Sequence, residues 1–445
     1  MDAPKIKRRE RDTIIQALRA GVVPRLGLQH IQVGRVREIE EMVKDIGRIE
    51  DGGASIRFII GEYGSGKTFF LNLVRLIALE KGMVVMSADL APDRRLHATG
   101  GQARSLFAEL TRNTATRTKP EGGALTSVVE RFVTQAIRDA ETEDRNPDDV
   151  IREKLAHLEE LHGGFEFATV ISRYWQGHED GNEDLKANAM RWLRAEFATR
   201  TDARAALKVR TIIDDASVYD HLKLFSALVR EAGYKGLVIV LDEMVNLYKL
   251  SNSQARNANY EQILRVLNDI LQGSASHFGV LLGGTPEFLM DTRRGLYSYQ
   301  ALQSRLAQNT FARDGLIDLS GPVVGLSNLT PEDLYVLLRN IRNVFTSDGS
   351  VDLPDEALQA FMHHCSERIG DAYFRTPRNT VTAFAHLLSV IEQNPGIEWR
   401  DLLSEIPLTE DGGDDLSDID ESVGSVQQDE GTEPSGSDEL SEFKL

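Results

Sequence analysis

Short runs of apolar residues recur along the chain and predict buried β-strands. Four of the runs are continuous and rich in Val, Ile, Leu and Phe, and a fifth is weaker. Segments with helical periodicity separate them. This alternation predicts an α/β fold, in which helices cover both faces of a parallel sheet. The predicted strands are residues 56–60, 83–88, 236–241, 278–284 and, more weakly, 322–326.

The long interval between the second and third predicted strands contains only helix-like patterns. Apolar residues recur there three and four positions apart, which is typical of helices with one buried face. Pro and Gly separate some of these segments, as in residues 119–123. The interval is therefore predicted to be a large helical insertion. Its helices are predicted at 103–112, 125–140, 150–161, 167–175 and 185–197.

The chain beyond the fifth strand is helical in pattern to about residue 393. Thr330 followed by Pro331 is a typical helix start, and this region is predicted to form a C-terminal helical lid. A further helix is predicted at 9–19, before a break rich in Gly and Pro. The predicted division is an N-terminal helix and linker (1–30), a sheet core (31–100 and 235–329), the helical insertion (101–234), the lid (330–408) and a tail (409–445).

The net charge of −18 is concentrated in the tail. Residues 409–445 hold 13 acidic residues and one lysine, a net of −12, which leaves −6 for the rest of the chain. The tail is predicted to be disordered and solvating, or alternatively to dock a basic partner. A single cysteine, Cys365, excludes an intramolecular disulfide and favours the cytosol. No apolar run approaches the roughly 18 residues that would span a membrane.

The sequence between the first strand and the following helix, 69–79, is a complete G-x-x-x-x-G-K-[ST] phosphate-binding motif. Strand, loop and helix in this order are the context that this motif requires. The glycines let backbone N–H groups face the phosphates, Lys67 reaches the β- and γ-phosphates, and Thr68 ligates Mg²⁺. The motif predicts an ATP and Mg²⁺ site formed by Gly61, Glu62, Tyr63, Gly64, Ser65, Gly66, Lys67, Thr68 and the neighbouring Phe69.

Two acids, Asp242 and Glu243, end the third predicted strand. In a parallel sheet they lie at the carboxyl edge beside the phosphate-binding loop, where ligands bind. Asp242 is predicted to hold Mg²⁺, and Glu243 to activate the attacking water as a general base. The alternative interpretation is an acidic turn after a core strand.

Three further residues are candidates for the same reaction. Thr285 follows the fourth strand and could contact the γ-phosphate, or it could only cap the next helix. Arg305 could reach a neighbouring subunit as an arginine finger, although Arg313 or a plain surface role competes with this interpretation. Arg378, at the start of a lid helix, is preferred over Arg375 as the arginine that folds back on the nucleotide.

These residues resemble the AAA+/STAND-type branch of P-loop ATPases over about residues 28–100 and 235–400. The resemblance rests on the loop, the paired acids, the three candidates above and Val33-Gly34-Arg35. It implies that Val33, Gly34 and Arg35 contact the base. Thr285 stands where that family often has Asn.

A narrower similarity is to the ATP-binding proteins of bacterial BREX phage-exclusion systems. It lies in residues 11–28, 61–71 and 89–97 and extends over most of 10–400, without the acidic tail. The resemblance implies a cytosolic ATPase that works with other defence proteins on DNA, often beside a helicase.

The leading functional hypothesis is an ATP-hydrolysing motor or switch that forms a homo-oligomer and acts with DNA-processing partners. An alternative is an ATP-gated scaffold with little hydrolysis that recruits a helicase or nuclease. A third possibility is direct nucleic-acid binding through the basic residues 5–11 and the lid arginines, which no aromatic platform supports. The remaining conspicuous residues are expected to be structural, namely His363, His364, Cys365, Trp175 and Trp192.

Overall fold

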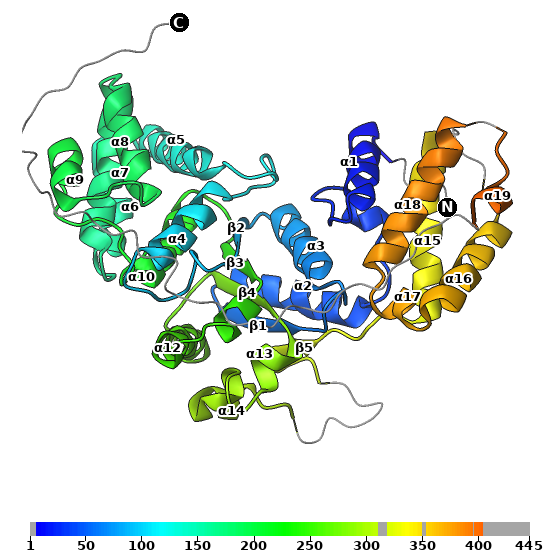
Figure 1. Cartoon of the computed structure of the whole chain (residues 1–445). Helices are drawn as coiled ribbons and strands as arrows, with labels where there is room; N and C mark the ends of the chain where they lie inside the picture. The colour runs from blue at the N-terminus through cyan, green and yellow to red at the C-terminus, as the bar shows by residue number, and fades with distance from the viewer. Residues whose placement is uncertain (1–5, 310–317, 349–352, 395, 404–445) are drawn as a thin grey trace, which may run out of the picture.

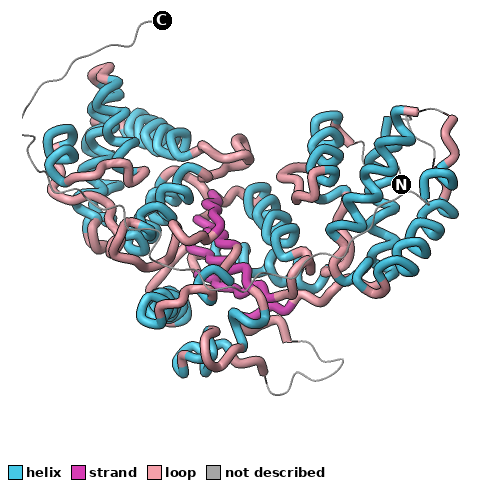
Figure 2. The backbone as a smooth tube through the Cα atoms, in the orientation of Figure 1, coloured by secondary structure: helices cyan, strands magenta, loops and turns pink. Residues whose placement is uncertain are grey.

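The computed structural model describes residues 6–309, 318–348, 353–394 and 396–403. Its centre is a sheet of five parallel strands in the order β2-β3-β4-β1-β5, surrounded by helices (Figure 2). All five predicted strands are confirmed, with ends that differ by no more than a few residues. The strands are β1 (Ala54–Ile60), β2 (Val84–Asp89), β3 (Leu237–Asp242), β4 (Phe278–Gly284) and β5 (Val323–Gly325).

Helices cover both faces of the sheet, as the strand pattern predicts. Alternate side chains of each strand face opposite sides, so Phe58 and Ile59 belong to different hydrophobic clusters. Helices α2 (Val36–Glu50) and α3 (Lys67–Glu80) pack on the face of Ile59. The other face is covered by α4 (Gln102–Arg112), α10 (Val218–Glu231) and α12 (Ser253–Leu271).

The strand order places two loops that are far apart in sequence at one edge of the sheet. Strand β1 lies between β4 and β5, while the chain leaves it for the far strand β2 and returns through β3 and β4. The loops that follow β1 and β3 therefore open at the same carboxyl edge, at a reversal of strand order. Ligands bind at such a position in open α/β sheets.

The interval between β2 and β3 is helical where the structure describes it, and it lies on one side of the sheet (Figure 1). Trp175 and Trp192 are buried there, so they are core residues, as expected. The fifth predicted segment ends too late, because Ala195 takes a left-handed conformation, φ 57°, just after α8. Two helices, α9 and α10, were not predicted. Besides α4 and α10, the helices are α5 (Leu125–Glu143), α6 (Pro147–Glu159), α7 (Gly164–Glu179), α8 (Glu183–Leu193) and α9 (Arg200–Leu207).

The C-terminal helices form a separate layer on the opposite side (Figure 1). Thr330 caps the first of them, as predicted, because its Oγ1 accepts a hydrogen bond from the backbone N–H of Asp333 at 3.1 Å. The predicted tail, 409–445, lies outside the described residues. The lid helices are α15 (Pro331–Phe345), α16 (Asp355–Ile369), α17 (Ala372–Arg375), α18 (Arg378–Gln393) and α19 (Trp399–Leu403).

The N-terminal helix α1 (Arg8–Arg19) packs against the helices of this lid. Its residues Ile14 and Leu18 share one buried cluster with Leu338 and Phe384 of the lid. The guanidinium of Arg11 also donates to the Glu392 carboxylate at 2.5 Å. The remaining short elements are η1 (Leu28–His30), α11 (Val245–Tyr248), α13 (Pro286–Met290), η2 (Leu296–Ser298), α14 (Gln300–Leu306) and η3 (Thr346–Asp348).

A buried histidine makes the stability of the helical insertion depend on pH. His221 lies in a group of aromatic rings that includes Phe167 and Trp192, and burial lowers its pKa below the ordinary value of 6.5. The unfolded chain therefore binds a proton more readily than the folded chain. The contribution of His221 to the free energy of unfolding is fully present above pH 6.5 and falls as the pH drops below that value.

We expect His221→Asn to weaken this dependence. Asn stays neutral, and its amide can replace the ring nitrogen Nδ1 that lies 2.8 Å from the carbonyl oxygen of Ser217. Melting temperatures measured from about pH 8 to about pH 5 should fall less steeply for the variant than for the parent protein. If the melting temperatures of the two proteins fall equally steeply with pH, His221 is not the source of the pH dependence.

Candidate functional site

The loop between β1 and α3 has the backbone of an anion-binding turn. Gly64 and Gly66 have φ values of 74° and 83°, which side chains other than glycine rarely allow. A side chain at Gly64 would also meet Thr376 of the lid at 3.1 Å. Backbone N–H groups beside such left-handed residues converge into an anion-binding concavity. Gly64 and Gly66 therefore allow a backbone conformation that suits the predicted phosphate-binding role of this loop.

Lys67 is the first residue of α3, so it lies where the positive end of the helix dipole faces the loop. Its Nζ donates to the carbonyl oxygens of Gly61 at 2.9 Å and Glu62 at 2.8 Å. The ammonium group is thus held along the inside of the loop. A cation and a helix N-terminus together favour a bound anion.

The loop and the paired acids, far apart in sequence, meet at the sheet edge. The Thr68 hydroxyl donates to the Asp242 carboxylate at 2.6 Å, and Asp242 is buried at the end of β3. Glu243 follows with φ 58°, a conformation that turns the chain sharply. The backbone N–H of Glu243 donates to Asp242 Oδ1 at 2.9 Å, which holds the Asp242 carboxylate against the turn that follows β3.

A third acid, Asp89, was not predicted as a site residue. Strand β2 pairs with β3 in a register that sets Asp89 opposite Asp242. Burial, and then the negative charge of Asp242, raise the pKa of the Asp89 carboxyl above its ordinary range. The signal was present, because Asp89 ends its strand as Asp242 ends the next. Two carboxyl groups therefore lie side by side on this wall of the site, an arrangement that a bound cation would stabilise.

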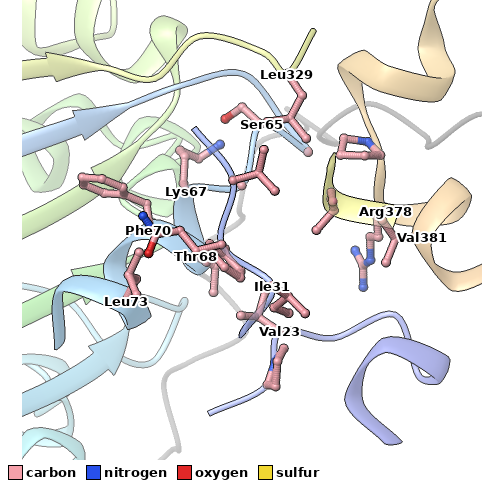
Figure 3. A pocket seen from close by; sticks show the side chains of 18 of the residues that line it. Val23, Ile31, Ser65, Lys67, Thr68, Phe70, Leu73, Leu329, Arg378 and Val381 are labelled. Carbon is pink, nitrogen blue, oxygen red and sulfur yellow. The ribbon is translucent and has the colours of Figure 1, made fainter. Parts of the chain in front are cut away.

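A cavity of about 580 Å³ joins these groups to the lid (Figure 3). This size is typical of a site for a cofactor-sized ligand. One end is polar and contains Lys67, Thr68, Asp89 and Glu243. The other end is apolar, with walls from the segment after α1, from α3 and from the lid. The apolar walls include Leu18, Val22, Val23, Pro24, Ile31, Ile39, Leu73, Leu337 and Val381.

Arg378 reaches into this cavity from the lid, opposite Lys67 and Thr68 (Figure 3). Its Nη1 donates to the Tyr63 hydroxyl at 3.1 Å, and its Nε donates to the Gly21 carbonyl oxygen at 2.9 Å. One side chain thus joins α18, the glycine-rich loop and the segment after α1. Arg375 pairs instead with Asp371 at 3.4 Å and is not among the cavity-lining residues.

Val33, Gly34 and Arg35 also line the cavity, but Arg35 makes contacts that the sequence did not predict. Its guanidinium donates to backbone carbonyl oxygens of Ser65 and Gly66, in the glycine-rich loop. Burial lowers the pKa of Arg35 below its ordinary value. The side chain of Arg35 therefore points at the loop backbone, and contact of Val33, Gly34 and Arg35 with a base stays a prediction.

The structure leaves two predicted residues away from the cavity lining. Thr285 is 4% exposed and caps α13, with Oγ1 accepting from the Phe288 N–H at 3.4 Å. Arg305 donates within its own helix, to the carbonyl oxygen of Ala301 at 2.8 Å. Helix α14, which carries Arg305, lies beyond the strands from the lid (Figure 1). Arg313 is outside the described residues.

Other candidate chemistry receives no support from the described part of the chain. Cys365 is buried in the lid core, and burial raises the pKa of its thiol to about 12, so it is unreactive. No group of three or more His, Cys, Asp or Glu side chains among the described residues could hold a metal ion by itself. Within that part, no helix is long and apolar enough to cross a membrane.

The basic N-terminal residues are partly engaged within the molecule. Arg9 pairs with Glu121 of the insertion, and Arg11 pairs with Glu392 of the lid. Arg8 is exposed and lies within 3.9 Å of the Asp12 carboxylate. These pairings weaken the case for this stretch as a nucleic-acid surface.

Comparison with known proteins agrees with this site. No curated protein matches the chain. The sequence model of one family, described as "BREX system ATP-binding protein BrxC/D", matches residues 6–406. The match includes the glycine-rich loop, the paired acids and the lid arginine. The chain therefore belongs to the family of BREX system ATP-binding proteins, BrxC/D.

Proposed function

We propose that this protein binds ATP with Mg²⁺ in the cavity and hydrolyses it. The observation that carries the proposal is the 2.6 Å hydrogen bond from Thr68 to Asp242, beside the Lys67 ammonium group. Phosphates bound in the loop would accept hydrogen bonds from Lys67 and from the backbone N–H groups. The apolar end of the cavity suits a base, with Val33 and Gly34 beside it.

The residues at the sheet edge fit a magnesium ion. Thr68 and Asp242 present oxygen ligands, and Asp89 adds a negative wall behind them. Mg²⁺ is usually bound by one or two protein oxygens together with substrate phosphates and water, so no larger cluster is required. When bound, the ion would neutralise charge that develops on the phosphates. Thr68 and Asp242 would hold it.

Glu243 is the proposed general base. It lines the cavity next to Asp242 and would take a proton from the attacking water. Arg378 would contact the phosphates from the lid and exclude water. Two roles remain proposals that geometry supports less: Thr285 as a sensor of the γ-phosphate, and Arg305 as a residue acting on a neighbouring subunit in a homo-oligomer.

The family membership supports a place in phage defence with other BREX proteins. We propose that ATP turnover drives a motor or switch in the cytosol, together with a helicase or other DNA-processing partner. DNA would be contacted directly or through that partner.

Phosphate release by the purified protein tests the proposal. We expect turnover of ATP that requires Mg²⁺, with DNA present or absent. Lys67→Ala should weaken ATP binding at least about tenfold, because it removes a charged hydrogen-bond donor, and should abolish turnover. Turnover that is identical in the parent and Lys67→Ala would exclude hydrolysis at this site. Equal ATP affinity in the two proteins would exclude the site itself.

A second candidate is an ATP-gated scaffold with little hydrolysis. The contacts of Arg378 with Tyr63 and Gly21 favour it, since nucleotide entering the cavity would compete for this arginine. The lid and α1, which share one core, would then move together. The scaffold predicts strong thermal stabilisation by a non-hydrolysable ATP analogue with negligible turnover.

The lid arginine itself can be tested with a matched neighbour. Arg378→Gln should lower the rate of ATP turnover by about tenfold or more, because it removes a positive charge facing the phosphates. Arg375→Gln makes the same change three residues earlier, outside the cavity lining, and should leave the rate unchanged. Equal rates for both variants would contradict the assignment of Arg378.

A further inference from the structure

Arg35 occupies an unusual position between α2 and the glycine-rich loop. It is the residue before α2, and its φ of 59° lies in the left-handed region. Non-glycine residues rarely adopt this conformation unless the surroundings require it, and such residues concentrate at functional sites. The conformation directs the chain from Gly34 into α2, while the guanidinium lies against the loop.

The guanidinium donates only to backbone carbonyl groups in the contacts that the structure gives. Nη2 donates to the Ser65 oxygen, and Nη1 donates to the Gly66 oxygen at 3.3 Å. Nη2 also lies 3.4 Å from the carbonyl oxygen of Ser327, on the segment between β5 and the lid. A planar, always charged fork with several donors suits such a set of acceptors.

Each of these two carbonyl groups shares a peptide unit with an N–H group at the end of the glycine-rich loop. The Ser65 carbonyl shares its peptide unit with the Gly66 N–H, and the Gly66 carbonyl shares its unit with the Lys67 N–H. In a trans peptide the C=O and N–H bonds point in opposite directions. A cation that holds both carbonyl groups on one side therefore turns both N–H groups to the other side.

The packing of Gly66 supports this arrangement independently. A Cβ atom built on Gly66 would lie 3.5 Å from Arg35 Nη1 and 3.9 Å from Cζ. The guanidinium thus lies directly over the α-carbon of Gly66, whose φ of 83° also requires glycine. The guanidinium and the glycine-rich loop therefore pack closely against each other.

We propose that Arg35 is a positioning residue, which holds the glycine-rich loop in its phosphate-receiving conformation by binding the carbonyl groups of Ser65 and Gly66. It does not contact the base. This inference rests on the proposed nucleotide site. A loop that Arg35 holds in this conformation would lose less conformational entropy when phosphate binds. The same side chain reaches Ser327, so it also ties the loop to the connection that leads to the lid.

The test compares ligands with and without phosphates. The variant is Arg35→Met, which keeps much of the side-chain length but removes the donors. We expect its affinities for ATP and ADP to fall by about tenfold to a hundredfold, as for lost hydrogen bonds to a charged group. Its affinity for adenosine, measured by ligand-observed NMR at high concentration, should equal that of the parent. Arg37→Met, an exposed arginine on α2, is the control and should change none of these affinities.

Each other result overturns the inference. Weaker adenosine binding, together with a matching loss for ATP, would make Arg35 a base contact. Unchanged ATP affinity would leave it without a role in binding. If Arg35→Met does not fold, judged by its thermal unfolding, Arg35→Lys is measured in its place. Lysine keeps the charge but not the fork, so the same phosphate-dependent loss is expected, smaller in size. Lys67→Ala tests the proposed nucleotide site separately from the role of Arg35. Unaltered ATP binding by Lys67→Ala would reject the nucleotide site itself.

Discussion

A Glu243→Gln variant is expected to bind ATP as tightly as the parent protein and to hydrolyse it at least about a hundredfold more slowly, the usual contribution of a general base. The substitution keeps the size of the side chain and its place in the cavity lining. It removes only the capacity to accept a proton at neutral pH. Because the carboxylates of Asp242 and Asp89 stay in place, the negative wall for the cation is retained. The measurements are phosphate release at saturating ATP and the affinity for ATP.

A matched control exists on the same edge of the sheet. Glu287 is an exposed residue of α13, outside the cavity lining, and Glu287→Gln should hydrolyse ATP at the parental rate. Turnover by Glu243→Gln within about twofold of the parent would remove Glu243 as the base. Weaker ATP binding by this variant would instead indicate a role in holding the nucleotide or its metal ion.

The sheet and the phosphate end of the site could be predicted because their signals are local. Each strand is a continuous apolar run, and a parallel sheet brings the residues after such runs to one edge. The meeting of Thr68 with Asp242 follows from this rule, although 174 positions separate them. Asp89 obeys the same rule and was overlooked only because a single acid after a strand is a weak signal.

The contacts of the lid and of Arg35 could not be predicted in this way. Helix α1 has a clear apolar face, but periodicity does not say which other face covers it, and here the lid does. The bonds of Arg35 depend on a left-handed residue and on a loop about thirty positions away. Such contacts follow from tertiary packing, which overrides local preference. The contacts of Arg35 with the loop backbone could therefore be seen only in the structure.

The largest effect on stability is expected from a charged side chain that is buried within a strand. Arg57 is 2% exposed in the middle of β1, among apolar residues. Its Nε donates to Asp45 Oδ2 at 2.5 Å and its Nη2 to Asp45 Oδ1 at 3.0 Å. Its Nη1 donates to the carbonyl oxygen of Leu319 at 2.7 Å, just before β5. The pair thus joins α2, β1 and the approach to the edge strand.

Asp45→Ala is expected to lower the free energy of unfolding by about 3 kcal/mol, because it removes the closest counter-charge of the buried guanidinium and leaves only the Glu41 carboxylate, at 3.4 Å. Urea unfolding of the purified protein measures this loss. Lys44→Ala, which breaks an exposed pair with Glu41 on the same helix, should change the unfolding midpoint only slightly. A loss from Asp45→Ala no larger than that of Lys44→Ala would show that the guanidinium is satisfied without the carboxylate.

The double variant Asp45→Leu/Arg57→Met distinguishes two contributions to the free energy of unfolding. One is the destabilisation by an unpaired buried charge, and the other is the stabilisation by the intact ion pair. Apolar side chains of similar size fill the same space without any charge to desolvate, so the double variant should be more stable than Asp45→Ala alone. It still lacks the bond from Arg57 to Leu319, which holds the chain that enters β5. Strand β5 borders β1, whose end forms the glycine-rich loop. If the pair also orders this edge, the double variant will recover stability while its affinity for ATP stays below that of the parent.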